Sequence, residues 1–254
     1  MKPLMSKLIM TAAIVSATAF AGAAYAQDEG SGWYGAARAG LATMNDPELT
    51  FTDTATSDNI VTKLHTDNAF GAAGELGYRW NGWRFAGELS YQKHDSDSIT
   101  FVSANGAPIT AGDVGDALDA LEDAGVIDSQ AGLTASGTTV SSSGGAIAEL
   151  RQVGFMANVA YDIPTGTSIT PYVMGGVGGV NTHAEAFGVG DSVTRFAWQL
   201  GAGAAVDVAS NVQLTADYRY RQTGGGDLGD LPGVDIHLGS TKSHFIAVGG
   251  RVRF

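Results

Sequence analysis

Polar and apolar side chains alternate with a period of two along much of this chain, in segments of about ten residues. The clearest is 212–222, where an apolar set and a polar set interleave: Val212, Leu214, Ala216, Tyr218 and Tyr220 against Gln213, Thr215, Asp217, Arg219 and Arg221. A helix would scatter the charges of Asp217, Arg219 and Arg221 around its circumference, whereas a strand places them on one face. The pattern therefore predicts β-strands.

Six segments show this alternation clearly, and two show it more weakly. They are 70–80, 83–92, 153–163, 196–206, 212–222 and 244–254, followed by the weaker 33–44 and 169–182. In the six clear segments every charged residue falls on the polar face. Strands of about ten residues with this alternation are typical of transmembrane β-barrels. The sequence predicts an all-β fold, a closed eight-stranded antiparallel up-and-down transmembrane β-barrel.

Short and long connections between these segments take turns along the chain. The short ones are Asn81-Gly82, which is a strong hairpin signal, Pro164-Thr165-Gly166 and Ala209-Ser210-Asn211. The long ones cover about 45–66, 95–146, 183–192 and 224–241. Short periplasmic turns and long extracellular loops are the layout of outer-membrane barrels. An even number of strands places both termini on the periplasmic side.

A soluble barrel or sandwich also alternates, but it would place the aromatic face inside and the charged face in water. Eight of the nine arginines share the polar face of a segment, and Arg151 is the exception. Guanidinium groups suit partly buried ion pairs because they stay charged and form planar, bidentate bonds. The opposite faces carry aromatic residues near the strand ends, as in the girdles of membrane barrels. Composition thus favours the membrane barrel.

The polar faces predict an ionic network that fills the lumen, since eight strands leave room only for side chains. Its expected members are Arg38, Glu75, Arg79, Arg84, Glu88, Asp162, Arg195, Asp207, Asp217, Arg219, Arg221, Arg251 and Arg253. An open diffusion pore is not expected.

The first 26 residues predict a cleaved signal peptide, which leaves 27–254 as the barrel. Lys2 and Lys7 give a positive start, an apolar run follows, and Ala24 and Ala26 form a small-x-small cleavage site. The alternative is a membrane anchor, because the uncharged run 8–26 is about long enough to span. The acidic residues that follow favour cleavage, and hence export.

Charge and composition narrow the classes of partner that the protein is expected to bind. The formal net charge is −12, which argues against nucleic acid because phosphate binding needs clustered Lys and Arg. The four long loops hold 17 of the 26 acidic residues. The chain has no Cys, and its five histidines lie in or beside different loops without ligand spacing. We expect no metal, no cofactor and no catalytic residue.

A short helix is expected within the second long loop. Thr110 can cap it together with Asp113, and an apolar stripe then follows up to Gly125. The stripe consists of Val114, Ala117, Leu118 and Leu121. Such a helix either caps the barrel mouth or presents a face to a partner.

Three stretches carry a family resemblance: "PYVMGGVGGVNT" (171–182), "FAWQLGAGAAVDVASNVQLTADYRYRQTGGGD" (196–227) and the terminal "GGRVRF". They resemble the closing half of small eight-stranded outer-membrane proteins of Gram-negative bacteria, the OmpA/OmpX-like and opacity-protein-like group. The resemblance covers about 150–254 well and 27–94 more loosely. It implies an outer-membrane location and insertion by the barrel-assembly machinery, which reads a last strand ending in Phe. The matching residues are Ile246, Val248, Val252 and Phe254, and Gly250 departs from the pattern.

These observations predict a structural and surface-interaction protein, a monomer in outer-membrane lipid that displays acidic loops to an unidentified surface ligand. The alternative is a narrow channel for small solutes or ions. A lipid-modifying enzyme ranks third, because Ser243 and His244 are sequence neighbours on a strand, which places their side chains on opposite faces.

Overall fold

The computed structural model of the chain describes residues 31–123, 132–143, 146–186, 189–231 and 233–254. The expected signal peptide, with Ala24 and Ala26, lies outside these ranges. Among the described residues, no helix combines the length and apolar character needed to cross a membrane.

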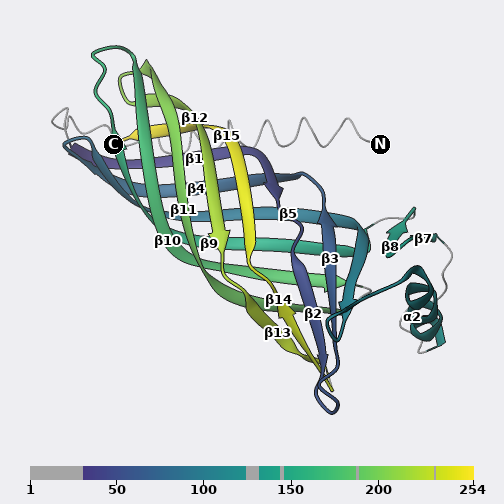
Figure 1. Cartoon of the computed structure of the whole chain (residues 1–254). Helices are drawn as coiled ribbons and strands as arrows, with labels where there is room; N and C mark the ends of the chain where they lie inside the picture. The colour runs from purple at the N-terminus through teal and green to yellow at the C-terminus, as the bar shows by residue number, and fades with distance from the viewer. Residues whose placement is uncertain (1–30, 124–131, 144–145, 187–188, 232) are drawn as a thin grey trace.

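Eight strands close into an antiparallel ring (Figure 1). They are β1 (Ser31–Met44), β4 (Ala69–Trp80), β5 (Trp83–Ala104), β9 (Ala148–Asp162), β10 (Ile169–Ala186), β11 (Val189–Ala209), β12 (Val212–Thr223) and β15 (Thr241–Arg253). β5 pairs with β9 from Trp83↔Tyr161 to Ser96↔Ala148, and this pairing closes the ring. The predicted eight-stranded barrel is confirmed, and each predicted segment coincides with one of these strands.

Short turns gather at one end of the barrel, here named the turn end, and the longer connections lie at the other, the loop end. Asn81 and Gly82 join β4 to β5 with positive φ values of 47° and 83°, as expected for a tight Asn-Gly hairpin. The last strand ends here as well, where the Phe254 amide donates to the Trp33 carbonyl at 3.0 Å. The C-terminus is thereby held against the first strand.

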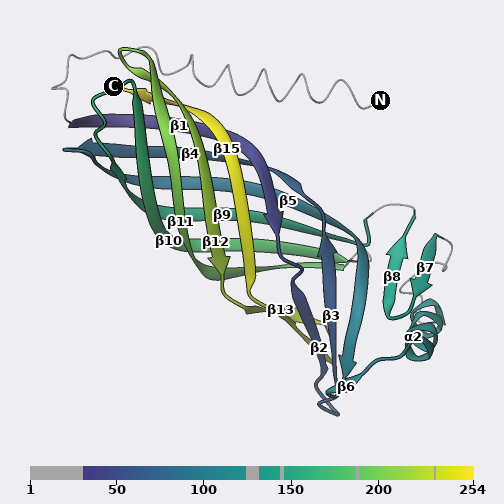
Figure 2. The same cartoon turned by 45° about the horizontal axis from the view of Figure 1, so that its top comes forward.

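The loop end contains more strands than the sequence predicted. These are β2 (Glu48–Asp53), β3 (Asn59–Thr66), β6 (Ala107–Pro108), β7 (Leu133–Ser136), β8 (Thr139–Ser142), β13 (Gly226–Leu231) and β14 (Val234–Leu238). The order β13-β14-β2-β3-β5 forms an antiparallel sheet that continues beyond the ring (Figure 2). Most of 45–66 and 224–241 is therefore sheet rather than loop. The connection 183–192 is also largely strand, because β10 and β11 pair as far as Ala186↔Val189.

An apolar cluster, named here the loop-end core, fills the inside of this extension. Its buried members are Met44, Leu49, Leu64, Ile99, Val114, Leu118, Val140, Ala148, Leu150, Leu228 and Leu238. They come from the ring, from the extension and from the helix, so burial of their apolar surface holds the three parts together.

The expected helix is present as α2 (Ala111–Asp123). Val114 and Leu118 pack into the loop-end core, which confirms the predicted inner stripe at these two positions. At the start of the helix the Thr110 amide donates to Asp113 Oδ2 at 2.8 Å, and the Asp113 amide donates to Thr110 Oγ1 at 3.4 Å. These bonds from Thr110 lower the pKa of the Asp113 carboxyl below its ordinary value. One face of the helix is thus part of the loop-end core.

A β-bulge in β5 separates the ring from the extension. His65 pairs with Ser98, but the next residue of β3, Thr66, pairs with Ser96, which leaves Asp97 as an extra residue. Leu89 and Ile99 are both odd-numbered, yet Leu89 is 51% exposed on the outside and Ile99 is buried in the loop-end core. The bulge therefore exchanges the two faces of the strand.

The outer surface of the ring is apolar, which confirms the predicted assignment of faces. Phe155, Phe196, Ile246 and Val248 are 63%, 64%, 65% and 68% exposed. In water such an uninterrupted apolar belt would be unfavourable, whereas lipid tails match it. Charged side chains near the middle of the same strands, among them Glu75, Glu88 and Asp217, are turned inward.

Candidate functional site in the barrel lumen

The inward residues of the ring form a buried polar interior, and Glu88 of β5 lies at its centre. Arg38 Nη1 is 2.8 Å from Glu88 Oε2, and Arg221 Nη2 is 3.3 Å from Glu88 Oε1. Arg219 also contacts the carboxylate. Two amides, from Asn158 and Gln199, donate to it at 3.1 and 3.4 Å. One carboxylate therefore joins three arginines from two different strands.

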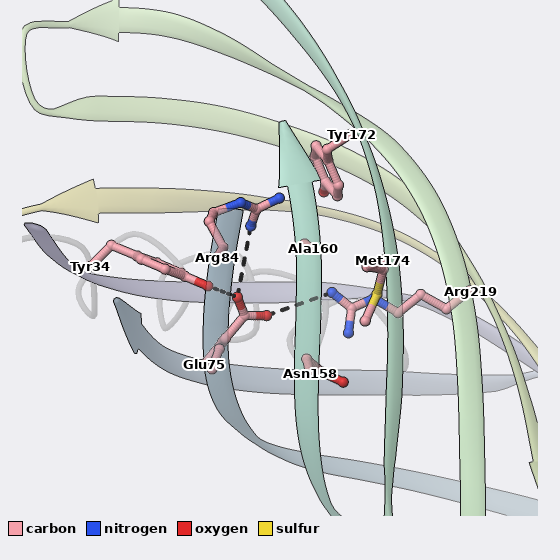
Figure 3. A pocket seen from close by; sticks show the side chains of 9 residues that line it. Tyr34, Glu75, Arg84, Asn158, Ala160, Tyr172, Met174 and Arg219 are labelled. Carbon is pink, nitrogen blue, oxygen red and sulfur yellow. Dashed lines mark hydrogen bonds and ion pairs between the residues drawn. The ribbon is translucent and has the colours of Figure 1, made fainter. Parts of the chain in front are cut away.

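Glu75 of β4 forms the second centre (Figure 3). Its Oε2 lies 2.6 Å from Arg38 Nη2 and 3.8 Å from Arg219 Nη2. Its Oε1 accepts a hydrogen bond from the Tyr34 hydroxyl at 2.6 Å and is 3.9 Å from Arg84 Nη1. Every oxygen of this buried carboxylate is thus matched to a donor, as burial of a charge requires.

Asp217 and Asp162 complete the carboxylates of the interior. Asp217 accepts from Arg219 Nε at 2.6 Å and from the Tyr172 hydroxyl at 3.2 Å. Nearer the turn end, Asp162 accepts from Arg84 Nε at 2.9 Å and lies 3.6 Å from Arg79 Nε. Charge-assisted contacts therefore continue from the middle of the lumen to its turn end.

Two arginines of the predicted network have no carboxylate within ion-pair distance in the described part of the chain. Arg195 instead donates to the carbonyls of Gly224 and Gly239, at 2.9 and 3.0 Å, and to Thr182 Oγ1 at 2.8 Å. Arg251 donates to Gln213 at 3.0 Å. Arg195 was expected to belong to the ionic network. It has neutral partners instead, because it lies at the loop end of β11, where neutral groups surround it.

Arg253 and Asp207 form a separate pair at the turn end, 3.2 Å apart, with side chains that are 33% and 41% exposed. Both were expected inside the lumen, and the structure places them at its rim. Arg79 is intermediate, with a side chain that is 26% exposed. The buried network is thus smaller than the predicted set.

Sequence reasoning missed the neutral members of the interior. Tyr34 and Tyr172 lie in the two weaker segments, and both are almost fully buried, at 1% and 3% exposure. The guanidinium groups of Arg84 and Arg251 stack on both rings, with centroid distances from 4.6 to 5.8 Å. Tyr34 and Arg38 are both even-numbered residues of β1, so the alternation alone could have predicted that Tyr34 faces the lumen. The rings replace carboxylates as partners for Arg251.

A small cavity lies inside the network. It has a volume of about 10 Å³ and lies between Tyr34, Glu75, Arg84, Tyr172 and Arg219. This volume corresponds to about one water molecule.

Each buried tyrosine lies beside a glycine of the neighbouring strand. Tyr34 pairs with Gly77 and Tyr172 pairs with Gly203. A Cβ on Gly77 would lie 2.7 Å from Tyr34 Cζ and 2.6 Å from the Phe85 carbonyl oxygen, and one on Gly203 would lie 2.7 Å from Tyr172 Cζ. Only glycine leaves room for the rings.

Replacing Gly77 by Ala is therefore expected to lower the free energy of unfolding by about 1–3 kcal/mol, the usual cost of overpacking. Urea unfolding in lipid vesicles measures the change. Gly74→Ala is the matched control on the same strand, because a Cβ there meets no atom within 4 Å. Equal stability of the two variants would contradict the steric role of Gly77.

The four residues of the expected insertion signal lie on the outward parity of β15 and just beyond it. Ile246 and Val248 face outward, and the ring of Phe254 lies 3.8 Å from the Cβ position of Gly35 on β1. Val252 differs, because neighbouring groups leave it only 9% exposed. Its contact with lipid is thus less than expected.

Ser243 and His244, the pair considered for a lipid-modifying enzyme, lie on opposite faces of β15. Among the described residues, no cluster of three His, Asp or Glu side chains is arranged to hold a metal ion. Ser243 is buried inside, at 5% exposure, while His244 faces outward, where its Nδ1 lies 2.7 Å from the Tyr218 hydroxyl. These two neighbours therefore do not act on one substrate atom.

A closed ring that is apolar outside and charged inside defines a transmembrane β-barrel. The outer membrane protein beta-barrel domain family matches residues 12–254, and the chain belongs to this family. It is an outer-membrane protein.

Individual relatives are more distant. The outer membrane protein PagN of Salmonella typhimurium is 33% identical over 86 residues, which cover 30% of this chain and 36% of that protein. This alignment therefore spans about a third of the relative. Neisserial surface protein A has 18% identity and a TM-score of 0.48, with 89% of this chain and 99% of that one covered. OprG from Pseudomonas aeruginosa has 12% identity and a TM-score of 0.45, with 90% and 100% covered.

Proposed function

We propose that this protein is a structural and surface-display barrel of the outer membrane, closed to solutes, whose acidic loop end contacts a partner outside the cell. The observation that carries the proposal is the buried network around Glu88. Its carboxylate draws Arg38, Arg219 and Arg221 across the lumen, and all four side chains are buried. Such a network supports a plug rather than a pore.

A second barrier lies in series with the first. The loop-end core closes the mouth with apolar side chains from the ring, the extension and α2. An ion that entered from this end would first cross apolar groups and then a set of fixed charges already paired with one another. Both layers oppose permeation, because an ion leaving water requires compensating partners.

Conductance in a planar bilayer tests the closed state. The purified protein is expected to give no steady openings. Steady, sizeable openings would contradict the plug and support the narrow channel. Glu88→Gln is a useful companion, because loosening the network should raise any residual leak above that of the native protein.

The loop end is proposed to face the outside of the cell, with both ends of the barrel chain on the periplasmic side. The layout of short turns at one end and long connections at the other supports this orientation. The loop end also carries most of the acidic residues, including Asp113, Asp116 and Asp119 on α2. A negatively charged surface of this kind favours a partner with positive charge.

Protease treatment of intact cells tests the orientation. Cleavage is expected only within the loop end, above all in 95–146, because the turn end lies behind the membrane. Cuts at 163–168 or 208–211 would reverse the assignment. Lysed cells are the control, since both ends are then accessible.

The remaining parts of the proposal concern biogenesis. Residues 1–26 are proposed to be removed after export, with cleavage following Ala26. The barrel-assembly machinery is proposed to recognise β15 through Ile246, Val248 and Phe254. A monomer is proposed because the network of Glu75 and Glu88 is complete within one chain.

A further inference from the structure

Asp46, His65 and Thr100 are connected by hydrogen bonds on the outside of the loop-end extension, and they are named here the outer triad. His65 Nδ1 lies 2.8 Å from Asp46 Oδ2, and His65 Nε2 lies 2.8 Å from Thr100 Oγ1. The hydroxyl of Thr139 lies a further 2.7 Å from that of Thr100. Four side chains thus form one continuous chain of hydrogen bonds.

Two strands and one connection bring the outer triad together. His65 belongs to β3 and Thr100 to β5, which pair in the extension, while Asp46 lies between β1 and β2. The neighbours Leu64 and Ile99 on the same strands are buried in the loop-end core. Alternation therefore turns His65 and Thr100 to the outside. The side chains of His65 and Asp46 are 42% and 41% exposed, so a dissolved molecule can reach them.

The hydrogen atoms of the outer triad can be assigned from its chemistry. A carboxylate only accepts, so His65 Nδ1 carries the proton that points to Asp46. In the neutral ring Nε2 is then an acceptor, and the Thr100 hydroxyl donates to it. Because Thr100 has no second hydrogen to donate, Thr139 is the donor between the two hydroxyls. The Thr66 amide donates to the other oxygen of Asp46 at 3.2 Å, which fixes the carboxylate.

The outer triad has the arrangement of a nucleophile, its general base and the residue that orients the base. Donors for an oxyanion lie on the same face, because Lys63 and Thr139 are the direct cross-strand partners of Thr100 on its two sides. Lys63 Nζ is 3.2 Å from Glu48. An ammonium group has three donors, so it can contact an oxyanion as well. The groups that acyl transfer requires are therefore present.

We propose that the outer triad is an acyl-transfer site that hydrolyses carboxylic esters, with Thr100 as nucleophile, His65 as general base and Asp46 as positioning residue. Thr100 Oγ1 bonds to the ester carbonyl carbon while its proton passes to His65 Nε2. The ester carbon–oxygen bond then breaks, and the leaving alcohol takes that proton. Water, deprotonated by the same imidazole, releases the carboxylic acid from the acyl-threonine, and the proton returns to Thr100. One ester and one water thus give one acid and one alcohol.

The experiment treats the full, detergent-solubilised barrel with a fluorophosphonate, a reagent for hydroxyl groups that a base activates. The Thr100 oxygen forms a bond to phosphorus, fluoride leaves and the hydroxyl proton passes to His65. Peptide mass spectrometry is expected to place the adduct on Thr100. Because this measurement uses purified protein, its outcome is independent of the protease and conductance tests.

Four variants and the pH dependence test the assigned roles. Thr100→Val should abolish the adduct, whereas Thr100→Ser should retain it because the hydroxyl remains. His65→Gln should slow labelling about a hundredfold or more, the usual contribution of a general base. Labelling of the native protein should also slow on acidification, because a protonated imidazole accepts no proton. In Asp46→Asn this decline should move to lower pH, since the carboxylate no longer stabilises the protonated ring.

Ser98 is the internal control. It lies on the same face of β5 as Thr100, but its hydroxyl donates to Asp97 at 3.2 Å instead of to His65. Ser98 should stay unlabelled, and Ser98→Ala should leave the rate at Thr100 unchanged. Folding of each variant is checked by its heat-modifiable migration in gels, and the acid decline tests the base if His65→Gln does not fold. Three results would overturn the proposal: no adduct on Thr100, equal labelling of Ser98, or a rate that neither His65→Gln nor acid lowers.

Discussion

Replacing Glu88 by Gln is expected to lower the free energy of unfolding by about 3–5 kcal/mol, the usual cost of breaking a buried ion pair. The amide keeps the size of the side chain but removes the charge that Arg38, Arg219 and Arg221 share. Three buried guanidinium groups would then repel one another with less compensation. Urea unfolding in lipid vesicles, followed by tryptophan fluorescence, measures the loss.

Asp207→Asn is the control for this experiment. Asp207 also pairs with an arginine, Arg253, but the pair lies at the rim of the turn end and both side chains are partly exposed. Exposed pairs contribute about 0–1 kcal/mol because water screens them. A loss in Glu88→Gln no larger than in Asp207→Asn would show that the lumen is wet and that its charges are screened.

Val248→Arg is expected to impair insertion, with a loss of about 2–4 kcal/mol for an arginine in the middle of the lipid face. Val248 is 68% exposed on the outer surface and pairs with Ala39 and Ala216, far from both ends of β15. The guanidinium group would lie among lipid tails without a partner. The yield of folded protein in vesicles and its urea midpoint report the effect.

Thr43→Arg provides the matched comparison for depth. Thr43 is also exposed on the outer face, but it lies next to the last residue of β1 at the loop end, where it pairs with His244. An arginine there reaches the headgroups, and the cost falls to about 0–1 kcal/mol. Equal penalties at positions 43 and 248 would mean that the apolar belt does not define the membrane.

The barrel was predictable because its signal is repeated eight times. Six ring strands alternate clearly and two, β1 and β10, more weakly, so the inner and outer faces could be assigned before any partner strand was known. The extension was not predictable in this way. β2, β3 and β14 have only six, eight and five residues. The pairings that join them to the rest of the sheet, β14 with β2 and β3 with β5, are between strands distant in sequence. The turn Asn105-Gly106, with positive φ at both residues, was the one local signal overlooked.

The sequence predicts which residues of the candidate site face the lumen, but not which of them contact one another. Parity shows that Arg195 and Asp207 share the polar face of β11, but they lie twelve residues apart, near opposite ends of the lumen. Which charges meet depends on the stagger between strands, and that stagger is set by the whole closed ring. For the same reason the sequence did not reveal that Tyr34 and Tyr172 would approach Arg251.

The bulge at Asp97 has a consequence for how this chain tolerates insertions and deletions. In the ring, the odd-numbered residues of β5 face outward, as Leu89 does. Beyond the extra residue the odd-numbered Ile99 is buried instead, so the bulge reverses which positions are apolar and buried. Deleting Asp97 would turn Ile99 out of the loop-end core and leave the ring strand unchanged. Asp97 thus lies at the junction of the ring and the extension, where a change in strand length should be poorly tolerated. The same holds at Val102, the extra residue of a second register shift between β3 and β5.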